Sequence, residues 1–123
     1  MRIKDCIFCQ QANRQFIIEN ERAGMIMDIN PVTKGHALII TKQHYDTLFD
    51  VPDADMNDMI HLLKKAKNYL DNHYQPDGYN VASNVGPVGG QRISHCHIHL
   101  IPRYKDGDGS GLPVQNNLPH SIS

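Results

Sequence analysis

Three histidines alternate with apolar residues in one short run, and this run restricts the possible folds more than any other feature of the chain. Residues 94–103 read Ser-His-Cys-His-Ile-His-Leu-Ile-Pro-Arg. Successive side chains of a β-strand point to opposite faces, so an extended backbone places His95, His97 and His99 on one face. Cys96 and its apolar neighbours then occupy the other face. The alternation predicts a strand with one face in a core and an imidazole face suited to proton transfer, nucleophilic attack or metal binding.

The length and composition predict a single soluble domain. The chain has 123 residues, of which 40% are hydrophobic and 20% are charged, as is typical of one globular core. A formal net charge of −1 provides no broad basic field, so nucleic acid is not an expected partner. No apolar run approaches the roughly 20 residues of a membrane helix, and residues 1–6 contain no signal-peptide core. We therefore expect a cytoplasmic protein without a membrane partner.

The three cysteines do not indicate a disulfide framework, because their number is odd and no export signal is seen. Cys6 and Cys9 are separated by two residues, a spacing found in zinc sites and in redox pairs. No strand precedes them, which favours a metal over a thioredoxin-like redox role. The alternative is a pair of small buried side chains. Cys96 is predicted to pack in the core.

The periodicity of the remaining chain predicts an α+β fold with a largely antiparallel sheet. Residues 53–73 are predicted to form one long helix, with Asp50 as its N-cap, because apolar side chains recur at helical spacing. The predicted apolar stripe consists of Met56, Met59, Ile60, Leu63, Ala66 and Leu70. Strands are predicted at 15–19, 24–28, 36–41 and 79–84, a short helix at 6–12, and a loop with a weakly ordered tail at 105–123. Solvated positions are predicted for His61, His73 and His120.

A glycine-rich loop at residues 85–90 precedes the histidine strand, and together they indicate chemistry at phosphorus. Glycines let main-chain amides converge on a phosphate, with Asn84 and Gln91 as neutral donors at the rim. A neutral His97 could attack phosphorus while a flanking histidine assists the leaving group, and water would then release the covalent intermediate. The alternative is a zinc-dependent hydrolase, because histidines at i and i+2 of a strand can share one metal.

Several motifs, in order along residues 5–104, resemble the histidine triad (HIT) family. They are Cys6-Ile7-Phe8-Cys9, Asp28-Ile29-Asn30-Pro31, Gly35-His36, Lys42-Gln43-His44, Gly89-Gly90-Gln91 and His95-Cys96-His97-Ile98-His99-Leu100-Ile101. The chain is most similar to the bacterial, Hint-like nucleoside phosphoramidate hydrolases. The resemblance implies a HIT-like domain over residues 1–104, with a five-stranded, mostly antiparallel sheet, one long helix and a short N-terminal helix, followed by a glycine-rich loop and polar tail at 105–123. It also implies a homodimer.

The resemblance implies roles for individual residues as well. His97 matches the nucleophile, His99 the histidine that contacts the phosphate and helps the leaving group, and His36 an additional active-site histidine. The implied substrate contacts are Asp28 to the ribose hydroxyls, Ile29 to the base, and Asn84, Gln91 and the amides near Gly90 to the phosphate. The implied structural zinc site consists of Cys6, Cys9, His44 and His95. No metal is needed for the chemical step.

Two positions depart from the family pattern. Arg92 stands where a small hydroxyl residue is common, and it either adds charge to the phosphate site or points to solvent. Ile26 stands where an aromatic side chain is common. We expect a hydrolase or transferase acting on the α-phosphate of purine nucleotide derivatives, either phosphoramidates or dinucleoside polyphosphates, through a covalent nucleotidyl-histidine. The remaining alternative is a nucleotide-binding regulatory protein with incidental activity.

Overall fold

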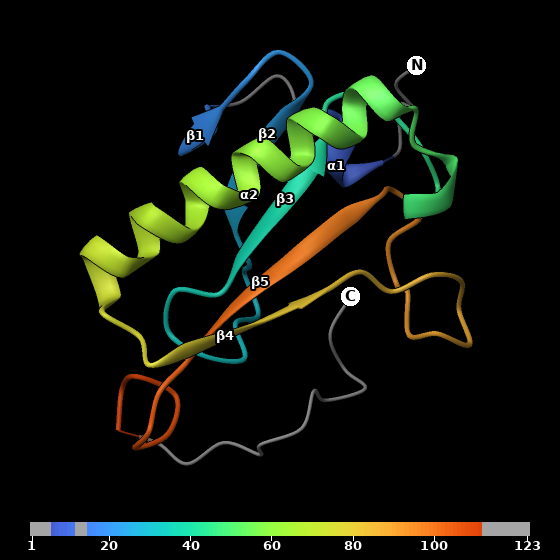
Figure 1. The fold of residues 1–123 in the computed structure, drawn as a ribbon. Coiled ribbons are helices and arrows are strands. Elements are labelled where there is room, and N and C mark those ends of the chain that lie inside the picture. Colours follow the sequence, from blue (N-terminus) through green and yellow to red (C-terminus); the bar gives the residue numbers. More distant parts are fainter. Residues whose placement is uncertain (1–5, 12–14, 112–123) are drawn as a thin grey trace.

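The computed structural model describes residues 6–11 and 15–111, whose strands form one antiparallel sheet (Figure 1). In chain order the elements are helix α1 (Ile7–Gln11), strands β1 (Ile18–Glu19), β2 (Ala23–Met27) and β3 (Ala37–Thr41), a 3-10 turn η1 (Leu48–Asp50), helix α2 (Asp53–Tyr74), and strands β4 (Gly78–Ala82) and β5 (His97–Arg103). The strand order is β1-β2-β3-β5-β4, which places the histidine strand β5 between β3 and β4. The predicted α+β fold with five antiparallel strands is confirmed.

Helix α2 crosses one face of the sheet and builds the main core with it (Figure 1). Its fully buried apolar side chains are Met59, Leu62, Ala66 and Leu70. These positions follow one another at intervals of three or four residues, so they share one stripe of the helix. Ile60 was predicted to belong to this stripe but is 41% exposed, because it lies one step of about 100° beyond Met59. Each large apolar side chain buried here contributes about 1.5–3 kcal/mol, which fixes the helix on the sheet.

The start of α2 differs from the prediction. Pro52 is the N-cap residue, and Asp50 belongs to the preceding 3-10 turn. Thr47 donates to the Asp50 carboxylate from its main-chain nitrogen at 3.1 Å and from Oγ1 at 3.0 Å, so this acidic group caps η1 instead. The helix continues through Tyr74 and ends where Gln75 adopts a left-handed φ of 52°.

The opposite face of the sheet carries a smaller apolar cluster that includes α1. Phe8 of this helix packs with Leu38 and Ile40 of β3. The strand register places Leu38 beside His99 and Ile40 beside His97. The two strand histidines therefore share a face with α1, while the alternate residues of β5 pack under α2.

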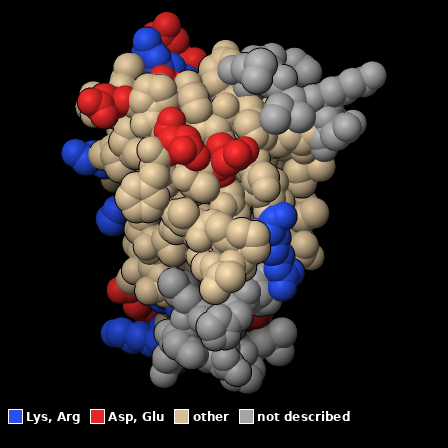
Figure 2. All heavy atoms as spheres, turned by 90° about the vertical axis from the view of Figure 1, so that its right-hand side faces the viewer, with Lys and Arg blue, Asp and Glu red and all other residues tan. Residues whose placement is uncertain are grey.

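One edge of the sheet and the neighbouring loops expose apolar side chains. Strand β4 is the edge strand, and its Val81 is 54% exposed. Phe49 in η1 and Val88 in the loop between β4 and β5 are almost fully exposed. The face on the side of η1 and this loop is mostly uncharged at its centre, with acidic side chains directly above (Figure 2). This surface is a candidate for contact with another protein chain.

The remaining predictions concern more peripheral residues. Cys96 is buried in the core beneath α2, as predicted, and burial raises the pKa of its thiol to about 12. His61 and His73 are exposed on α2, also as predicted. Residues 105–111 form turns, in keeping with the predicted loop. Ala12, His120 and the predicted tail from position 112 lie outside the described residues. Within the described part of the chain, no helix combines the length and apolarity needed to cross a bilayer.

Candidate active site

Two of the three histidines of the run belong to strand β5, and the third precedes it. Strand β5 begins at His97, and the chain bends through His95 before it. The His95 ring turns toward two thiols, with Nδ1 3.2 Å from Cys6 Sγ and 3.5 Å from Cys9 Sγ. His97 and His99 remain together on the β5 face, with ring centroids 5.1 Å apart. The bend therefore divides the run into one thiol-facing histidine and two strand histidines.

The His97 ring is held in one tautomer by the chain that precedes it. Its Nδ1–H donates to the carbonyl oxygen of His95 at 2.6 Å, which places the lone pair of the neutral ring on Nε2. The ring packs edge-on against Phe8, with centroids 5.0 Å apart. Ser83 Oγ donates to the carbonyl oxygen of His97 at 2.7 Å and anchors the strand at this point. A neutral imidazole with a defined basic nitrogen meets the requirement for a nucleophile.

His36 and His99 form a second hydrogen-bonded unit. The main-chain N–H of Val32 donates to His36 Nδ1 at 3.0 Å, so the neutral ring carries its proton on Nε2. That nitrogen donates to His99 Nδ1 at 2.9 Å, which places the proton of a neutral His99 on its own Nε2. Burial lowers the pKa of His36 to about 4, against the opposing charge of Asp28 and with a smaller contribution from His99. His36 is therefore an uncharged donor that orients His99 near neutral pH.

The Asp28 carboxylate lies beside this pair. Its Oδ2 is 3.5 Å from His36 Nε2 and 3.9 Å from His99 Nδ1, and its Oδ1 accepts the main-chain N–H of Asn30 at 2.9 Å. Only 10% of the Asp28 side chain is exposed, whereas Ile29 is 89% exposed. A ligand that reaches Asp28 therefore approaches past Ile29, which is compatible with the predicted ribose and base contacts.

The glycine-rich loop closes on itself and does not form an open cradle near Gly90. The N–H groups of Gly89 and Gln91 donate to the carbonyl oxygen of Gly86 at 3.1 and 3.0 Å, and that of Gly90 donates to Pro87 at 3.0 Å. The side-chain Oε1 of Gln91 accepts the N–H of Gly86 at 2.8 Å. Left-handed φ angles of 74° at Gly86 and 95° at Gly90 permit this tight turn. These amides are used inside the loop.

The main-chain donors nearest to the catalytic strand come after this loop. Within residues 6–11 and 15–111, no hydrogen-bond acceptor meets the main-chain N–H groups of Arg92, Ile93 and Ser94. Asn84 supports the loop, with Nδ2 donating to the carbonyl oxygen of Gly90 at 3.4 Å. The amides available to a phosphate therefore lie two to four positions beyond Gly90, directly before the histidine run.

A second cluster contains the four residues predicted to hold zinc. The ligand atoms of Cys6, Cys9, His44 and His95 all lie within 4.8 Å of one another. Cys9 Sγ is 3.3 Å from His44 Nδ1, and the two thiols are 3.2 and 3.5 Å from His95 Nδ1. In a tetrahedral zinc site with the usual bond lengths, a sulfur and a nitrogen ligand are about 3.6 Å apart. The donor set and its spacing therefore fit zinc.

The outer hydrogen bonds of both imidazoles direct their free nitrogens toward the thiols. His95 Nε2 donates to the carbonyl oxygen of Thr41 at 2.7 Å, and His44 Nε2 lies 3.0 Å from Asp46 Oδ1. Each ring then presents a Nδ1 lone pair to the cluster, as metal-bound histidines do. Burial lowers the pKa of His95 to about 4 and raises the pKa of the Cys6 thiol. His95 is therefore a neutral imidazole in the pH range where zinc binds.

Helix α1 joins the two clusters. Its Phe8 lies between the cysteines in sequence, and its ring packs edge-on against His95 at 5.7 Å and His97 at 5.0 Å. The N–H of Cys9 donates to Cys6 Sγ at 3.3 Å, so the same short helix shapes the thiol pair. A movement of α1 would disturb the thiols and His97 together.

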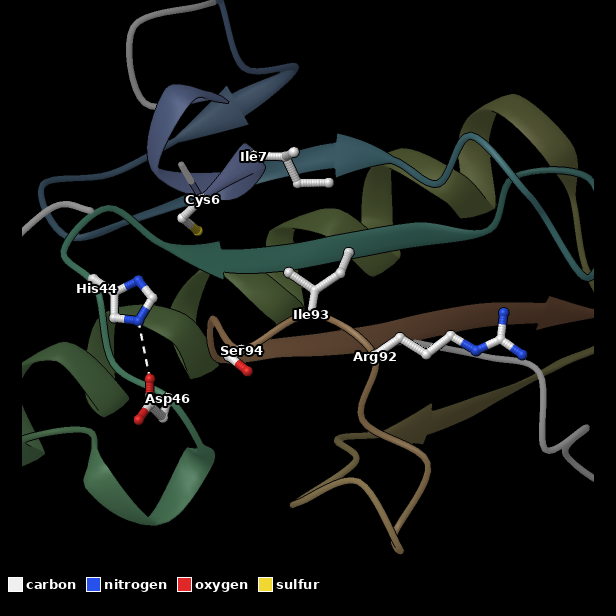
Figure 3. Close-up of a pocket in the computed structure, with 7 residues that line it drawn as sticks. All are labelled: Cys6, Ile7, His44, Asp46, Arg92, Ile93 and Ser94. Atoms are coloured by element: carbon white, nitrogen blue, oxygen red, sulfur yellow. Dashed lines mark hydrogen bonds and ion pairs between the residues drawn. The ribbon is translucent and has the colours of Figure 1, made fainter. Parts of the chain in front are cut away.

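A cavity of about 420 Å³ opens beside the metal cluster (Figure 3). Its lining consists of Cys6, Ile7, His44, Asp46, Arg92, Ile93 and Ser94. Asp46 and His44 lie at one end, and the Arg92 side chain points away from them (Figure 3). Arg92 was expected either to add charge to the phosphate site or to point to solvent. In the structure its side chain is exposed, and the residue forms part of the cavity wall.

The residues that orient the histidines are difficult to identify from sequence. Val32 acts through its main-chain N–H and Thr41 through its carbonyl oxygen, so neither side chain gives a signal. Phe8 resembles any core aromatic residue. Asp46 is the exception, because a carboxylate two residues after a candidate zinc ligand is a recognisable partner for that imidazole.

Comparison with known proteins agrees with this geometry. A sequence model described as HIT domain matches residues 10–106. The chain is 40% identical over 108 residues to the uncharacterized HIT-like protein MJ0866 of Methanocaldococcus jannaschii, covering 85% of this chain and 82% of the relative. It is 35% identical over 116 residues to adenosine 5'-monophosphoramidase HNT1 of Saccharomyces cerevisiae, covering 89% of this chain and 71% of that relative. The crystal structure of a zinc-bound histidine triad family protein from Mycobacterium smegmatis matches with a TM-score of 0.75 and 30% identity, over 92% of this chain and 84% of that one. The chain therefore belongs to the HIT domain family.

Proposed function

We propose that this protein is a nucleotide hydrolase or transferase that acts on the α-phosphate of purine nucleotide derivatives, either phosphoramidates or dinucleoside polyphosphates. The central observation is the 2.6 Å hydrogen bond from His97 Nδ1 to the carbonyl oxygen of His95. This bond leaves Nε2 of the neutral ring as the attacking nitrogen. Similarity to a protein named adenosine 5'-monophosphoramidase supports the same class of reaction.

In the first step, His97 Nε2 attacks the α-phosphorus, and a phosphorus–nitrogen bond forms as the bond to the leaving group breaks. In the proposed reactive state the negative phosphate is bound and His99 is protonated on both nitrogens, with its Nδ1–H and the Nε2–H of His36 both directed at Asp28 Oδ2, 3.9 and 3.5 Å away. His99 then gives its Nε2 proton to the leaving group. The main-chain N–H groups of Ile93 and Ser94 are the proposed donors to the phosphoryl oxygens.

In the second step, water attacks the phosphorus and the bond to His97 breaks. The neutral His99 takes a proton from this water, so both histidines return to their initial states and the nucleoside monophosphate leaves. The 2.9 Å hydrogen bond from His36 orients the His99 ring in the resting state, and Asp28 Oδ2 accepts from His36 while His99 Nδ1 is protonated. These residues account for the protons and bonds of both steps.

The mechanism is tested by trapping the intermediate. The protein is mixed with adenosine 5'-phosphoramidate and quenched without acid, because phosphorus–nitrogen bonds of this kind are acid-labile. Intact mass should rise by one adenylyl group, and peptide mapping should place it on His97. His97→Gln should abolish both the adduct and turnover, whereas His61→Gln, an exposed histidine of α2, serves as the matched control. Rapid turnover by His97→Gln would refute the assigned nucleophile.

A metal bound directly to the catalytic histidines is the second candidate, because the ligand atoms of Asp28, His36 and His99 also lie within 4.8 Å of one another. The hydrogen bonds disfavour it. Since His36 Nδ1 accepts the N–H of Val32, its Nε2 carries the proton, and a metal at Nε2 would have to displace that proton from a neutral ring. A strong chelator should therefore leave adduct formation intact in protein that remains folded, and complete loss at the chemical step would favour the metal.

We also propose that Cys6, Cys9, His44 and His95 hold a structural zinc. Two thiolates and two imidazoles at these separations are a common zinc ligand set, and both rings have an oxygen partner on the outer nitrogen. When bound, the ion would supply a cross-link between α1 and the segment before β5. It would contribute no group to the transfer step.

For the quaternary state, we propose a homodimer that uses the exposed apolar side of the molecule. Val81 lies on an edge strand, and Phe49 and Val88 are almost fully exposed. Unpaired strand edges and apolar patches favour association. Light scattering should give twice the mass of one chain, and Val81→Lys should weaken pairing.

The proposed compartment is the cytoplasm, because the thiols of the metal cluster need a reducing environment.

A further inference from the structure

We propose that Arg92 selects substrates whose leaving group carries a negative charge. This inference rests on the proposed transfer of a nucleotide to His97 and specifies the class of leaving group. Arg92 lines the cavity of about 420 Å³ that adjoins the segment before the catalytic strand. Ser94 belongs to the same cavity wall and lies three positions before His97. A phosphate held by the main-chain amides of Ile93 and Ser94 would therefore lie beside two residues of this cavity wall and close in sequence to Arg92.

The charges of the cavity are separated. Among its lining residues, Arg92 is the one lysine or arginine and Asp46 is the one carboxylate. Asp46 is hydrogen-bonded to His44 at 3.0 Å and lies at the opposite end from Arg92 (Figure 3). Ile7 and Ile93 provide the apolar wall between the two ends (Figure 3). The guanidinium group of Arg92 therefore lies at the edge of the cavity and is directed away from the Asp46–His44 end (Figure 3).

The guanidinium group is available to a ligand. In the part of the chain that the structure describes, no carboxylate oxygen lies within 4.0 Å of Arg92, and its guanidinium donates no hydrogen bond to another residue. Guanidinium donors match the two oxygens of a carboxylate or a phosphate in a bidentate arrangement. An anionic leaving group would therefore gain an interaction that a neutral one lacks.

The charges in the rest of the site suggest that Arg92 favours anionic leaving groups over neutral ones. His36 is neutral near pH 7, and Asp28 contributes a negative charge beside His99. A phosphoryl group alone can be held by main-chain amides of Ile93 and Ser94. A second negative charge on the leaving group meets no lysine or arginine in the cavity lining other than Arg92. The effect of Arg92 should therefore appear mainly with charged leaving groups.

The test uses two substrates with the same phosphorus–nitrogen bond: the adenosine 5'-phosphoramidates of glycine and of glycinamide. The leaving group of the glycine compound carries a carboxylate, whereas that of the glycinamide compound carries a neutral amide in its place. The wild-type kcat/KM should be about five- to tenfold higher for the glycine compound. Arg92→Gln should bring this ratio close to one, and Arg92→Lys should retain part of the preference. Lys65→Gln, which removes one positive charge from the exposed side of α2, should leave the ratio unchanged.

A second comparison distinguishes carboxylate from phosphate as the favoured anion. Adenosine 5'-diphosphate carries a phosphate leaving group, and its turnover relative to the glycinamide compound is measured for the same three Arg92 forms. Sensitivity of either ratio to Arg92→Gln supports the proposal and identifies the anion. Normal adduct formation on His97 with both ratios unchanged by Arg92→Gln overturns the role of Arg92 alone. Absence of any adduct or turnover in the wild type overturns the proposed function together with this inference.

Discussion

The carbonyl oxygen of His95 accepts the Nδ1–H of His97 at 2.6 Å, while the His95 ring faces the thiols of Cys6 and Cys9. One residue therefore serves both clusters, because its main chain sets the tautomer of His97, the proposed nucleophile, and its side chain belongs to the proposed zinc ligands. Phe8 strengthens this link by packing against both rings. The geometry couples the order of the metal cluster to the alignment of the nucleophile.

The first prediction follows from this coupling. Cys9→Ser should remove zinc, lower the melting temperature by on the order of 10 °C and slow adduct formation on His97 about tenfold. Bound zinc is measured by elemental analysis, unfolding by calorimetry, and the adduct by rapid-quench mass spectrometry. Cys96→Ala is the control, because this thiol is buried beneath α2 and away from the cluster. It should lower stability without changing the zinc content, and an unchanged zinc content in Cys9→Ser would contradict the assigned ligands.

The second prediction concerns acid stability. Burial lowers the pKa of His36 from 6.5 to about 4, so the unfolded chain binds more protons than the folded one between these pH values. The free energy of unfolding should fall as the pH falls through this window, with His36 contributing up to about 1.4 kcal/mol per pH unit. Urea unfolding at several pH values between 7 and 4 measures the slope. His36→Gln should flatten it, whereas His61→Gln should not, and equal slopes in both variants would disprove the assignment.

Much of the fold follows from local sequence patterns. The apolar stripe of residues 53–73 predicts α2 to within one residue at its end, because helical spacing over many turns is a strong signal. The alternation in β5 correctly assigns Cys96 to the core and His97 to the opposite face. Strand β1 is only two residues long instead of the predicted five, because such short segments pair by tertiary contact and not by pattern.

The candidate site was harder to predict where hydrogen bonds of main-chain atoms determine how its side chains and amides are arranged. The alternation treats His95 as a strand residue, but β5 begins at His97, and the His95 ring contacts Cys6 and Cys9, which are far away in sequence. The glycine loop suggests amides open to a phosphate, yet the structure satisfies the N–H of Gly90 within the loop. Hydrogen bonds such as that from Val32 to His36 involve main-chain atoms, which carry no sequence signal.

The third prediction concerns packing on the catalytic face. A Cβ atom at Gly24 of β2 would overlap the ring of Phe16, which belongs to the same apolar cluster as Phe8. Gly24→Ala should therefore lower the free energy of unfolding by about 1–3 kcal/mol, because the ring must shift. Gly78→Ala, in β4, is the matched control, since a Cβ there meets no atom within 4 Å. Urea unfolding of both variants decides, and equal stability would show that the Phe16 ring moves aside freely.

The last prediction separates two roles of Asp28. Its carboxylate lies 3.5 Å from His36 Nε2, so it can act on the histidines, but the resemblance to the family assigns it to the ribose hydroxyls. The two roles differ in their dependence on the sugar. If the carboxylate holds the ribose, Asp28→Asn should lower kcat/KM for an adenosine phosphoramidate by about 10- to 100-fold and change the 2'-deoxyadenosine compound much less, because a charged hydrogen bond to the 2'-hydroxyl is lost only in the first. We expect this result. An equal loss with both sugars would instead mean that Asp28 acts only through the charge of His99, and the ribose contact would have to be assigned elsewhere.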